Sequence, residues 1–289
     1  MPSITADAEA LVSRTLSGIG EIMTLPEITV RIIETVENPK STARDLHDII
    51  KNDPALSSKI LKVVNSAFYG LPGQIGAIDR AIVLLGLSAV KNIAIAASIT
   101  RLFKGHQLTR EFSAKDLWVH SLAVGVASRL LHKQVHRQGG DDVFLAGLIH
   151  DLGILAIRQA FPEQLREVIR RALETPQNYC EVEMEVMGAD HQAFGDGLAA
   201  KWKFPRHLRA VMGYHHTPEH LTEENLRLAT AIQVADILCC NARQGFYLQS
   251  YGLSPTPEQL AIVGIEQNQL ADVAEQLSEQ VVLAQSMFG

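Results

Sequence analysis

Residues 143–156, VFLAGLIHDLGILA, have the apolar spacing of a buried helix with one anomaly in the middle. The apolar positions recur at helical intervals and are Phe144, Leu145, Leu148, Ile149 and Leu152. His150 and Asp151 stand side by side among them. A carboxylate is almost never fully buried unless it is paired or binds a metal, so Asp151 needs a partner. A self-satisfying aspartate–histidine pair, or an aspartate at a helix end before Gly153, explains this segment as well as a metal does.

The composition is that of an ordinary globular protein. Of the 289 residues, 47% are hydrophobic and 20% charged, and only 6% are aromatic. A chain of this length can bury one large core or two smaller ones. Helical periodicity recurs along most of the chain and strand-like alternation is scarce, so we expect an all-α fold.

Charge, cysteine content and apolar runs indicate where the protein is located and what it does not bind. The net charge is −6 and the pI about 6.0, and no basic run marks a phosphate-binding surface, so we expect no direct nucleic-acid binding. Three cysteines, with Cys239 and Cys240 adjacent, are poor disulfide candidates and fit a reducing cytoplasm. The N-terminus lacks the basic region of a signal peptide, and no apolar run approaches the roughly 20 residues of a membrane span. We therefore expect a cytoplasmic protein without membrane contact.

The first hundred residues predict a series of short helices without catalytic chemistry. Ser41 or Thr42 would cap one helix, and Asp53 would cap another that has Pro54 in its first turn. This half has no glycine-rich phosphate loop, no cluster of histidine or cysteine, and no nucleophile beside a base. It indicates a packing or interaction module. The expected helices are 6–22, 27–37, 42–51, 55–65, 79–85 and 88–102.

The second half carries imidazole and carboxylate groups on successive expected helices. These helices are 116–132, 143–156, 165–173, 181–202, 207–216 and 227–242. The candidate metal ligands on them are His120, His150, Asp151, His191, His215, His216 and Asp236. Helical bundles build metal sites from side chains that face inward on neighbouring helices. Imidazole and carboxylate suit Zn, Fe, Mn, Co or Ni, so we expect one or two divalent transition-metal ions.

Each candidate also has a plain structural explanation. A single histidine on an apolar helix is more often a satisfied core residue than a ligand. Asp190 and His191 have the pattern of a helix cap, and His215 and His216, before a Thr-Pro step, that of an exposed helix end. We expect the remaining histidines to face solvent: His47, His106, His132, His136, His207 and His220.

Two stretches in the first half resemble a known family. They are DPALSSKILKVVNSAFYG at 53–70 and IDRAIVLLGLSAVKNIAI at 78–95, and Leu25-Pro26 precedes them. The order of these pieces resembles the HDOD domain, the HD-related output domain of bacterial signalling proteins, from about residue 20 to 240. The resemblance implies an N-terminal helical part at 1–105, packed on an HD-like helical bundle at 106–242. Residues 243–289 would then form a C-terminal helical extension.

The ligand candidates resemble those of the HD metal-dependent phosphohydrolases, to which HDOD domains are related. The resemblance implies that His120, His150, Asp151 and Asp236 hold one ion, with Asp151 bridging to a second. His191 and His215 or His216 would hold that second ion. Since ligand–metal bonds are only about 2.0–2.2 Å long, this hypothesis requires the side chains of His120, Asp151 and Asp236 to lie within about 8 Å of each other.

Departures from the HD pattern set the functional expectations. Ile154 stands where a phosphate-contacting lysine often follows the His-Asp doublet, and the Gly-Tyr-Pro signature of cyclic-di-GMP phosphodiesterases is missing near Tyr214. HDOD domains are generally regarded as non-catalytic. We therefore expect a signalling output module that binds protein partners, with a structural or vestigial metal.

Two alternatives stay open. One is a metal-dependent phosphohydrolase of a nucleotide or cyclic dinucleotide. The other is a sensor that binds such a nucleotide without hydrolysing it. An amphipathic helix expected at 267–287 has room for only about three heptads, so it would pack back on the domain or support a homodimer.

Overall fold

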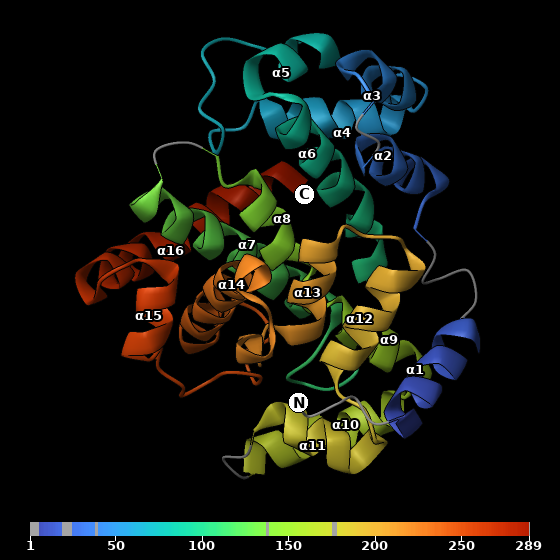
Figure 1. The fold of residues 1–289 in the computed structure, drawn as a ribbon, viewed down its shortest axis with the longest axis vertical. Helices are drawn as coiled ribbons and strands as arrows, with labels where there is room; N and C mark the ends of the chain where they lie inside the picture. Colours follow the sequence, from blue (N-terminus) through green and yellow to red (C-terminus); the bar gives the residue numbers. More distant parts are fainter. Residues whose placement is uncertain (1–5, 19–24, 38–39, 137–138, 175–177, 289) are drawn as a thin grey trace.

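The computed structural model describes residues 6–18, 25–37, 40–136, 139–174 and 178–288. Throughout these ranges the regular elements are α-helices and short 3-10 helices. The same ranges contain one isolated β-bridge, between Thr109 and Phe112. The all-α prediction is confirmed (Figure 1). The first helix is described only as α1 (Ala6–Gly18), and the rest of the expected 6–22 helix, residues 19–22, lies outside the described residues.

The N-terminal helices begin where the sequence places their caps. Thr42 caps α3 through a capping box with Asp45. Asp53 accepts a hydrogen bond from the Leu56 N–H at 2.9 Å, and Pro54 opens α4 at a position that needs no N–H. Helices α3, α4 and α5 gather at one end of the molecule, and α6 leads from them towards the remaining helices (Figure 1). The elements are α2 (Glu27–Glu37), α3 (Ala43–Ile50), α4 (Pro54–Val64), α5 (Ile78–Leu85), α6 (Leu87–Ile99) and η2 (Thr100–Phe103).

The second part of the chain is built around α7. Helices α8, α14 and α16 all pack against α7, and α6 packs against α8. The C-terminal helix α16 also touches α4, so it packs back on the chain. The elements are α7 (Ala114–Val135), α8 (Asp141–Ile149), α9 (Leu152–Ala160), α10 (Pro162–Glu174), α11 (Tyr179–Met187), α12 (His191–Lys201), α13 (Arg206–Tyr214), η3 (Pro218–His220), α14 (Glu223–Asn241), α15 (Pro257–Val263) and α16 (Gln267–Phe288).

Two segments expected to be single helices are each two helices. The 143–156 segment breaks between α8 and α9 at His150 and Asp151, where Asp151 has φ −97° and ψ 12°. The 181–202 segment breaks between α11 and α12, where Gly188 adopts a left-handed conformation. Apolar periodicity missed both breaks because apolar residues continue on both sides of each break. His150 and Asp151 stand at the first break, and His191 opens α12 after the second.

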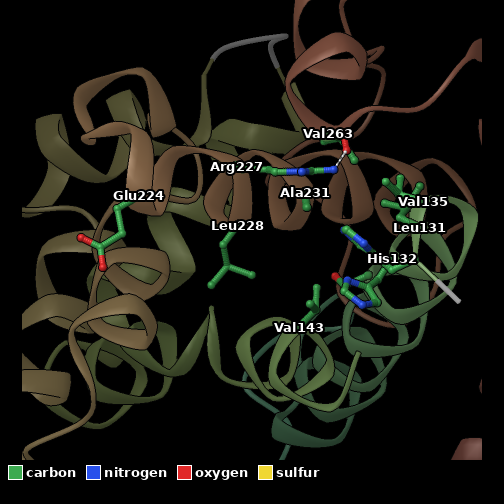
Figure 2. A pocket seen from close by; sticks show the side chains of 11 residues that line it. Leu131, His132, Val135, Val143, Glu224, Arg227, Leu228, Ala231 and Val263 are labelled. Carbon is green, nitrogen blue, oxygen red and sulfur yellow. Dashed lines mark hydrogen bonds between the residues drawn. The ribbon is translucent and has the colours of Figure 1, made fainter. Parts of the chain in front are cut away.

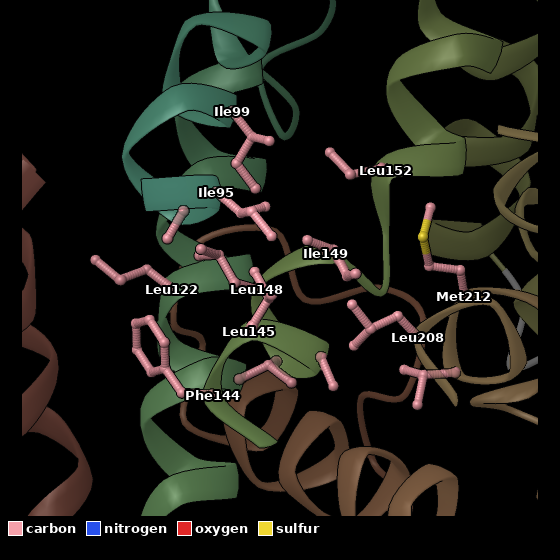
Figure 3. Packing of buried hydrophobic residues seen from close by; sticks show 14 of the residues in the cluster. Ile95, Ile99, Leu122, Phe144, Leu145, Leu148, Ile149, Leu152, Leu208 and Met212 are labelled. Carbon is pink, nitrogen blue, oxygen red and sulfur yellow. The ribbon is translucent and has the colours of Figure 1, made fainter. Parts of the chain in front are cut away.

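Helices α7 and α8 approach each other so closely that their backbones touch. A Cβ atom added to Gly147 would lie 2.8 Å from the Gly125 Cα, and one added to Gly125 would lie 2.8 Å from the Phe144 carbonyl oxygen. Only glycine permits this separation at both positions. Figure 3 shows the apolar side chains around the contact, including Leu122 of α7 and Leu145 of α8 with Ile95 of α6.

The N-terminal helices are attached to this pair through a polar contact. The Tyr69 hydroxyl donates to Asp141 at 3.1 Å, and the Asn92 amide donates to Asp142 at 2.6 Å. The Arg129 guanidinium lies 4.2 Å from the centre of the Phe68 ring. The segment around Phe68 and Tyr69 is part of the HDOD-like stretch 53–70, so that stretch docks on α7 and α8. The expected boundaries at 105 and 242 stay predictions.

One described segment, Asp141–Ala160, has the length and hydropathy of a membrane span. In the structure, 78% of its most apolar window is buried inside the protein. A core helix gives the same composition as a membrane helix, and this burial is consistent with a soluble protein. The segment therefore gives no support to a membrane contact.

Candidate metal centre

The seven candidate ligands converge in the interior of the second part of the chain. His120 comes from α7, His150 and Asp151 from the junction of α8 with α9, and Asp236 from α14. His191 opens α12, and His215 and His216 follow α13. Six of the seven residues are 0% exposed, and the side chain of His216 is 12% exposed. The exposed-helix-end explanation is therefore wrong for His215.

Asp151 stands between two pairs of histidines. Its Oδ2 lies 3.3 Å from the Nε2 of His150 and 3.5 Å from the Nε2 of His120. Its Oδ1 lies 3.5 Å from the Nε2 of both His191 and His215. Each carboxylate oxygen therefore faces its own pair of imidazoles, which is the arrangement of a bridging ligand. Although Asp151 occupies the N-cap position of α9, its side chain makes no capping bond.

Asp236 contacts one histidine of each group. Its Oδ1 lies 3.1 Å from the Nε2 of His120, and its Oδ2 lies 4.0 Å from the Nδ1 of His216. Donor atoms of His120, His150 and Asp151 all lie within 4.8 Å of one another. The same limit holds for a second group, formed by Asp151, His191, His215 and His216. The convergence that the metal hypothesis requires is present.

The donor atoms have the features of a site that fits divalent metal ions. Buried polar atoms in proteins are nearly always hydrogen-bonded. Here both ring nitrogens of His120, the Nε2 of His150 and the Oδ1 of Asp151 have no hydrogen-bond partner. The other ring nitrogens of His150 and His215 are held by the carbonyls of Gly147 and Val211, at 2.6 and 3.0 Å. Such bonds leave Nε2 free to ligate, so the residues present fit the ions that the family resemblance implies.

Glu183 is a member of the site that the sequence did not identify. Its Oε2 accepts from the Nδ1 of His191 at 2.6 Å and from the His191 backbone N–H at 2.9 Å. Burial alone would lower the pKa of His191, but the charge and hydrogen bond of Glu183 outweigh burial and raise that pKa to about 10. Burial raises the pKa of Glu183 itself. Glu183 precedes His191 by eight residues and lies on another helix, so no local pattern joins them.

The two central carboxylates are held in the ionised form. Burial would raise the pKa of Asp151, but the charge of the adjacent His150 outweighs burial and holds that pKa well below its ordinary value. For Asp236, burial is likewise outweighed by His120, whose Nε2 lies 3.1 Å from Oδ1, and the pKa of Asp236 is also lowered. Ionised carboxylates among imidazoles are the protonation state that a cation needs.

A loop between α14 and α15, residues 242–256, covers the centre, and we call it the closing loop. The Gln249 side-chain amide donates to Asp151 Oδ2, and the Ser250 hydroxyl donates to Asp236 Oδ2. Phe246 anchors the loop because its buried ring packs on Phe112 at 4.9 Å between ring centres. Its backbone N–H also donates to the Asp116 carbonyl. No sequence signal pointed to Gln249 or Ser250, since only tertiary packing brings them to the site.

The family comparison agrees with these observations. The family model of the HDOD domain matches residues 22–218, which is most of the chain. The chain belongs to the HDOD family. A curated relative, an uncharacterized protein of Treponema pallidum, is 28% identical over 222 residues, which are 76% of this chain and 42% of that protein. The chain therefore spans about two fifths of the length of that relative.

Solved structures share the HDOD fold along nearly the whole chain. An HDOD domain protein of unknown function from Geobacter sulfurreducens has a TM-score of 0.78 at 23% identity, covering 96% of both chains. A protein named putative phosphohydrolase from Shewanella amazonensis has a TM-score of 0.73 at 21% identity, covering 97% of this chain and 98% of its own. A putative signal transduction protein from Marinobacter aquaeolei has a TM-score of 0.75 at 21% identity, covering 99% of this chain and 68% of its own. The fold thus extends beyond residue 240, where the sequence resemblance ended.

The residues after the His-Asp doublet of this HDOD chain serve packing. A Cβ on Gly153 would lie 1.9 Å from the His191 carbonyl oxygen, so Gly153 lets α9 press against the start of α12. Ile154 is 0% exposed and belongs to the hydrophobic core. This position is therefore closed to solvent. Asp190 caps α12 by accepting from the Ala193 N–H at 2.8 Å, as its cap pattern predicted, while His191 turns into the centre.

A separate cavity lies between α7, α14 and α15 (Figure 2). Its volume is about 260 Å³, and none of the seven candidate ligands lines it. His132 and His136, whose ring centres are 4.5 Å apart, lie on its wall beside Leu228 and Val263. His132 is therefore half-buried against this cavity, in contrast to the solvent-facing position expected of it.

Proposed function

We propose that this chain is a regulatory output module that acts by binding partner proteins and contains a buried metal centre closed to phosphoester substrates. The observation that carries the proposal is the burial of the centre. All the donor atoms that face Asp151 belong to residues at 0% exposure, except for His216 at 12%. A phosphohydrolase must bring its substrate phosphorus to its metals, and here the closing loop lies over the carboxylates that would hold them.

The polar contacts of the closing loop support the same conclusion. Gln249 and Ser250, themselves 7% and 1% exposed, hydrogen-bond the two carboxylates. Burial of Ile154 removes a phosphate-contacting position from the surface. The likeness to the Marinobacter protein named putative signal transduction protein is in keeping with a signalling role.

The donor set gives the phosphohydrolase alternative its one specific support. Bound divalent ions would act as Lewis acids towards a phosphoryl oxygen. In this chain Asp151 faces two histidine pairs, an arrangement that suits a bridge between two such ions. The resemblance to a protein named putative phosphohydrolase is consistent with this alternative. A sensor that binds a nucleotide or cyclic dinucleotide without hydrolysis would need the closing loop to move.

Turnover by the metal-loaded full chain separates these functions. The chain is loaded with Mn²⁺, Fe²⁺ or Zn²⁺, its metal content is measured, and hydrolysis of nucleotides and cyclic dinucleotides is followed by chromatography. We expect one or two bound ions and no product above the Asp151→Ala control. Product that disappears with Asp151→Ala would establish the phosphohydrolase function. If the partner contact depends on the metal, in vivo crosslinking should join a partner protein to the wild-type chain and not to Asp151→Ala.

A further inference from the structure

We infer that the Cys240 thiolate is an additional ligand of the first ion, which gives that position a preference for thiophilic divalent metals such as Zn²⁺, Fe²⁺ and Co²⁺. This inference rests on the metal centre of the proposed function and goes beyond its imidazole and carboxylate ligands. The evidence is the position of the sulfur atom relative to His120 and Asp236.

The Cys240 sulfur lies inside the group of donor atoms. It lies 3.3 Å from Asp236 Oδ1, the same oxygen that lies 3.1 Å from the Nε2 of His120. Donor atoms of His120, Asp236 and Cys240 all lie within 4.8 Å of one another. With metal–sulfur bonds of about 2.3 Å and metal–nitrogen bonds of about 2.0–2.1 Å, one ion can reach three atoms so placed.

The unsatisfied imidazole of His120 points independently to a ligand at this position. His120 is 0% exposed, and neither of its ring nitrogens has a hydrogen-bond partner. A buried imidazole without hydrogen bonds is costly unless another group satisfies it. A cation between His120, Asp236 and Cys240 would satisfy the His120 Nε2 and convert the thiol to a metal thiolate. In that step a sulfur–metal bond forms, the S–H proton passes to solvent, and no electron is transferred.

The neighbouring cysteine shows that burial alone does not explain this position. Cys239 is as fully buried as Cys240, but it belongs to none of the donor groups found in the described part of the chain. Cys240 follows Asp236 by four residues on α14, and residues at this spacing share one face of a helix. Cys239 is therefore a matched control on the same helix. Cys180, on α11, belongs to a separate donor group with Glu183 and His191, so its substitution tests that other sulfur atom.

A mixed ligand set makes a prediction about which metals bind. Soft thiolate ligands favour Zn²⁺ and Fe²⁺ over Mn²⁺ and Mg²⁺, whereas an all-carboxylate and imidazole site discriminates less. The first position should therefore retain Zn²⁺ in competition with Mn²⁺, and that preference should weaken when the sulfur is replaced by oxygen. The second position, around His191 and His215, does not include Cys240, so its metal preference should stay the same in that variant.

Cobalt substitution tests this inference with a readout other than activity. Metal-free full-length protein is loaded with Co²⁺, and its absorption and cobalt content are measured together. We expect a thiolate-to-cobalt charge-transfer band in the near ultraviolet, lost in Cys240→Ser and kept in Cys239→Ser and Cys180→Ser. Cobalt bound without that band would overturn the Cys240 ligand and leave the metal centre standing. Absence of bound cobalt would overturn both.

A second measurement needs no substitution at Cys240. Zinc-edge X-ray absorption of the wild type should show a sulfur scatterer at about 2.3 Å besides nitrogen and oxygen at about 2.0–2.2 Å. This decides the question even if Cys240→Ser fails to fold. A first shell of nitrogen and oxygen alone would contradict the inference, and so would a sulfur signal that disappears in Cys180→Ser.

Discussion

Glu183 accepts two hydrogen bonds from His191, one from the ring Nδ1 at 2.6 Å and one from the backbone N–H at 2.9 Å. The pair is fully buried, and it directs the His191 Nε2 towards Asp151 Oδ1, 3.5 Å away. Glu183 is therefore a positioning residue for the half of the centre that contains His191 and His215. An outer carboxylate of this kind fixes both the tautomer and the orientation of a ligating imidazole.

Substitution Glu183→Gln should weaken the second ion selectively. Loss of an outer-shell partner typically costs about 10–100-fold in metal affinity. We expect a loss of this size for the ion beside His191 and His215 and little change for the ion beside His120 and His150. Isothermal titration calorimetry with Zn²⁺ measures the affinity of each ion. Glu185→Gln, which changes an exposed ion pair with Arg171, is the matched control. Equal weakening of both ions would contradict the assignment.

Alkaline pH should destabilise the metal-free protein. Glu183 raises the pKa of His191 to about 10, whereas an unfolded histidine has a pKa of about 6.5. The folded state therefore binds this proton more tightly, and the stabilisation is complete below pH 6.5 and is lost as pH rises through 10. Urea unfolding between pH 6 and 10 should show the decline. Glu183→Gln should flatten it, and a decline unchanged in that variant would assign the proton to another group.

Asp151 and His215 should differ in the number of ions lost on substitution. Asp151→Asn removes the charge shared by both histidine pairs, so we expect loss of both ions. His215→Gln changes only one pair, so we expect loss of about one ion by elemental mass spectrometry, in keeping with the two groups of donor atoms. His207→Gln, near the start of α13 and outside every donor group of the described residues, is the control that should keep both. Equal metal content in the Asp151 and His215 variants would show that Asp151 does not bridge.

The closing loop should contribute to the stability of the metal-free protein through Gln249. Its amide donates to the ionised Asp151, and hydrogen bonds to charged groups contribute about 1.5–3 kcal/mol. We expect Gln249→Ala to lower the free energy of unfolding by that amount in urea. Gln244→Ala, whose amide bonds the exposed Ser278 hydroxyl, should change it by less than about 0.5 kcal/mol. A similar small effect for both would mean that Gln249 does not hold the loop on the centre.

Gly153→Ala should damage both stability and the centre. The added methyl group would meet the His191 carbonyl oxygen at 1.9 Å, so α9 and α12 must separate. We expect destabilisation of about 3 kcal/mol or more, at the upper end of overpacking effects, and loss of bound metal. Gly76→Ala, with no atom within 4 Å of the added Cβ, is the control. Thermal unfolding measures the stability of the variant, and elemental analysis measures its metal content. A stable variant with full metal content would contradict the close approach of α9 and α12 at Gly153.

The sequence predicted the helices whose signals are local, and it named candidate ligands that the structure brings together. Glu27–Glu37, the caps at Thr42 and Asp53 and the ligand positions from His120 to Asp236 follow from periodicity, capping preferences and residue type. The breaks at Asp151 and Gly188 did not follow, because apolar residues continue on both sides. Glu183, Gln249 and Ser250 could not be identified, since each reaches the centre from an element distant in sequence. Cys240 had a usable signal, its four-residue spacing from Asp236.

The touching backbones of α7 and α8 at Gly125 and Gly147 have a consequence for ion size. His120 projects from one of these helices and His150 follows the other, so their separation is set during folding and not by the ion. A site whose ligands are held at a fixed separation favours ions of matching radius. Ca²⁺, which takes about six to eight oxygen ligands at 2.3–2.6 Å in a flexible shell, finds neither the ligand number nor the room here. The two glycines, which belong to neither donor group, thus help to set the separation of His120 and His150.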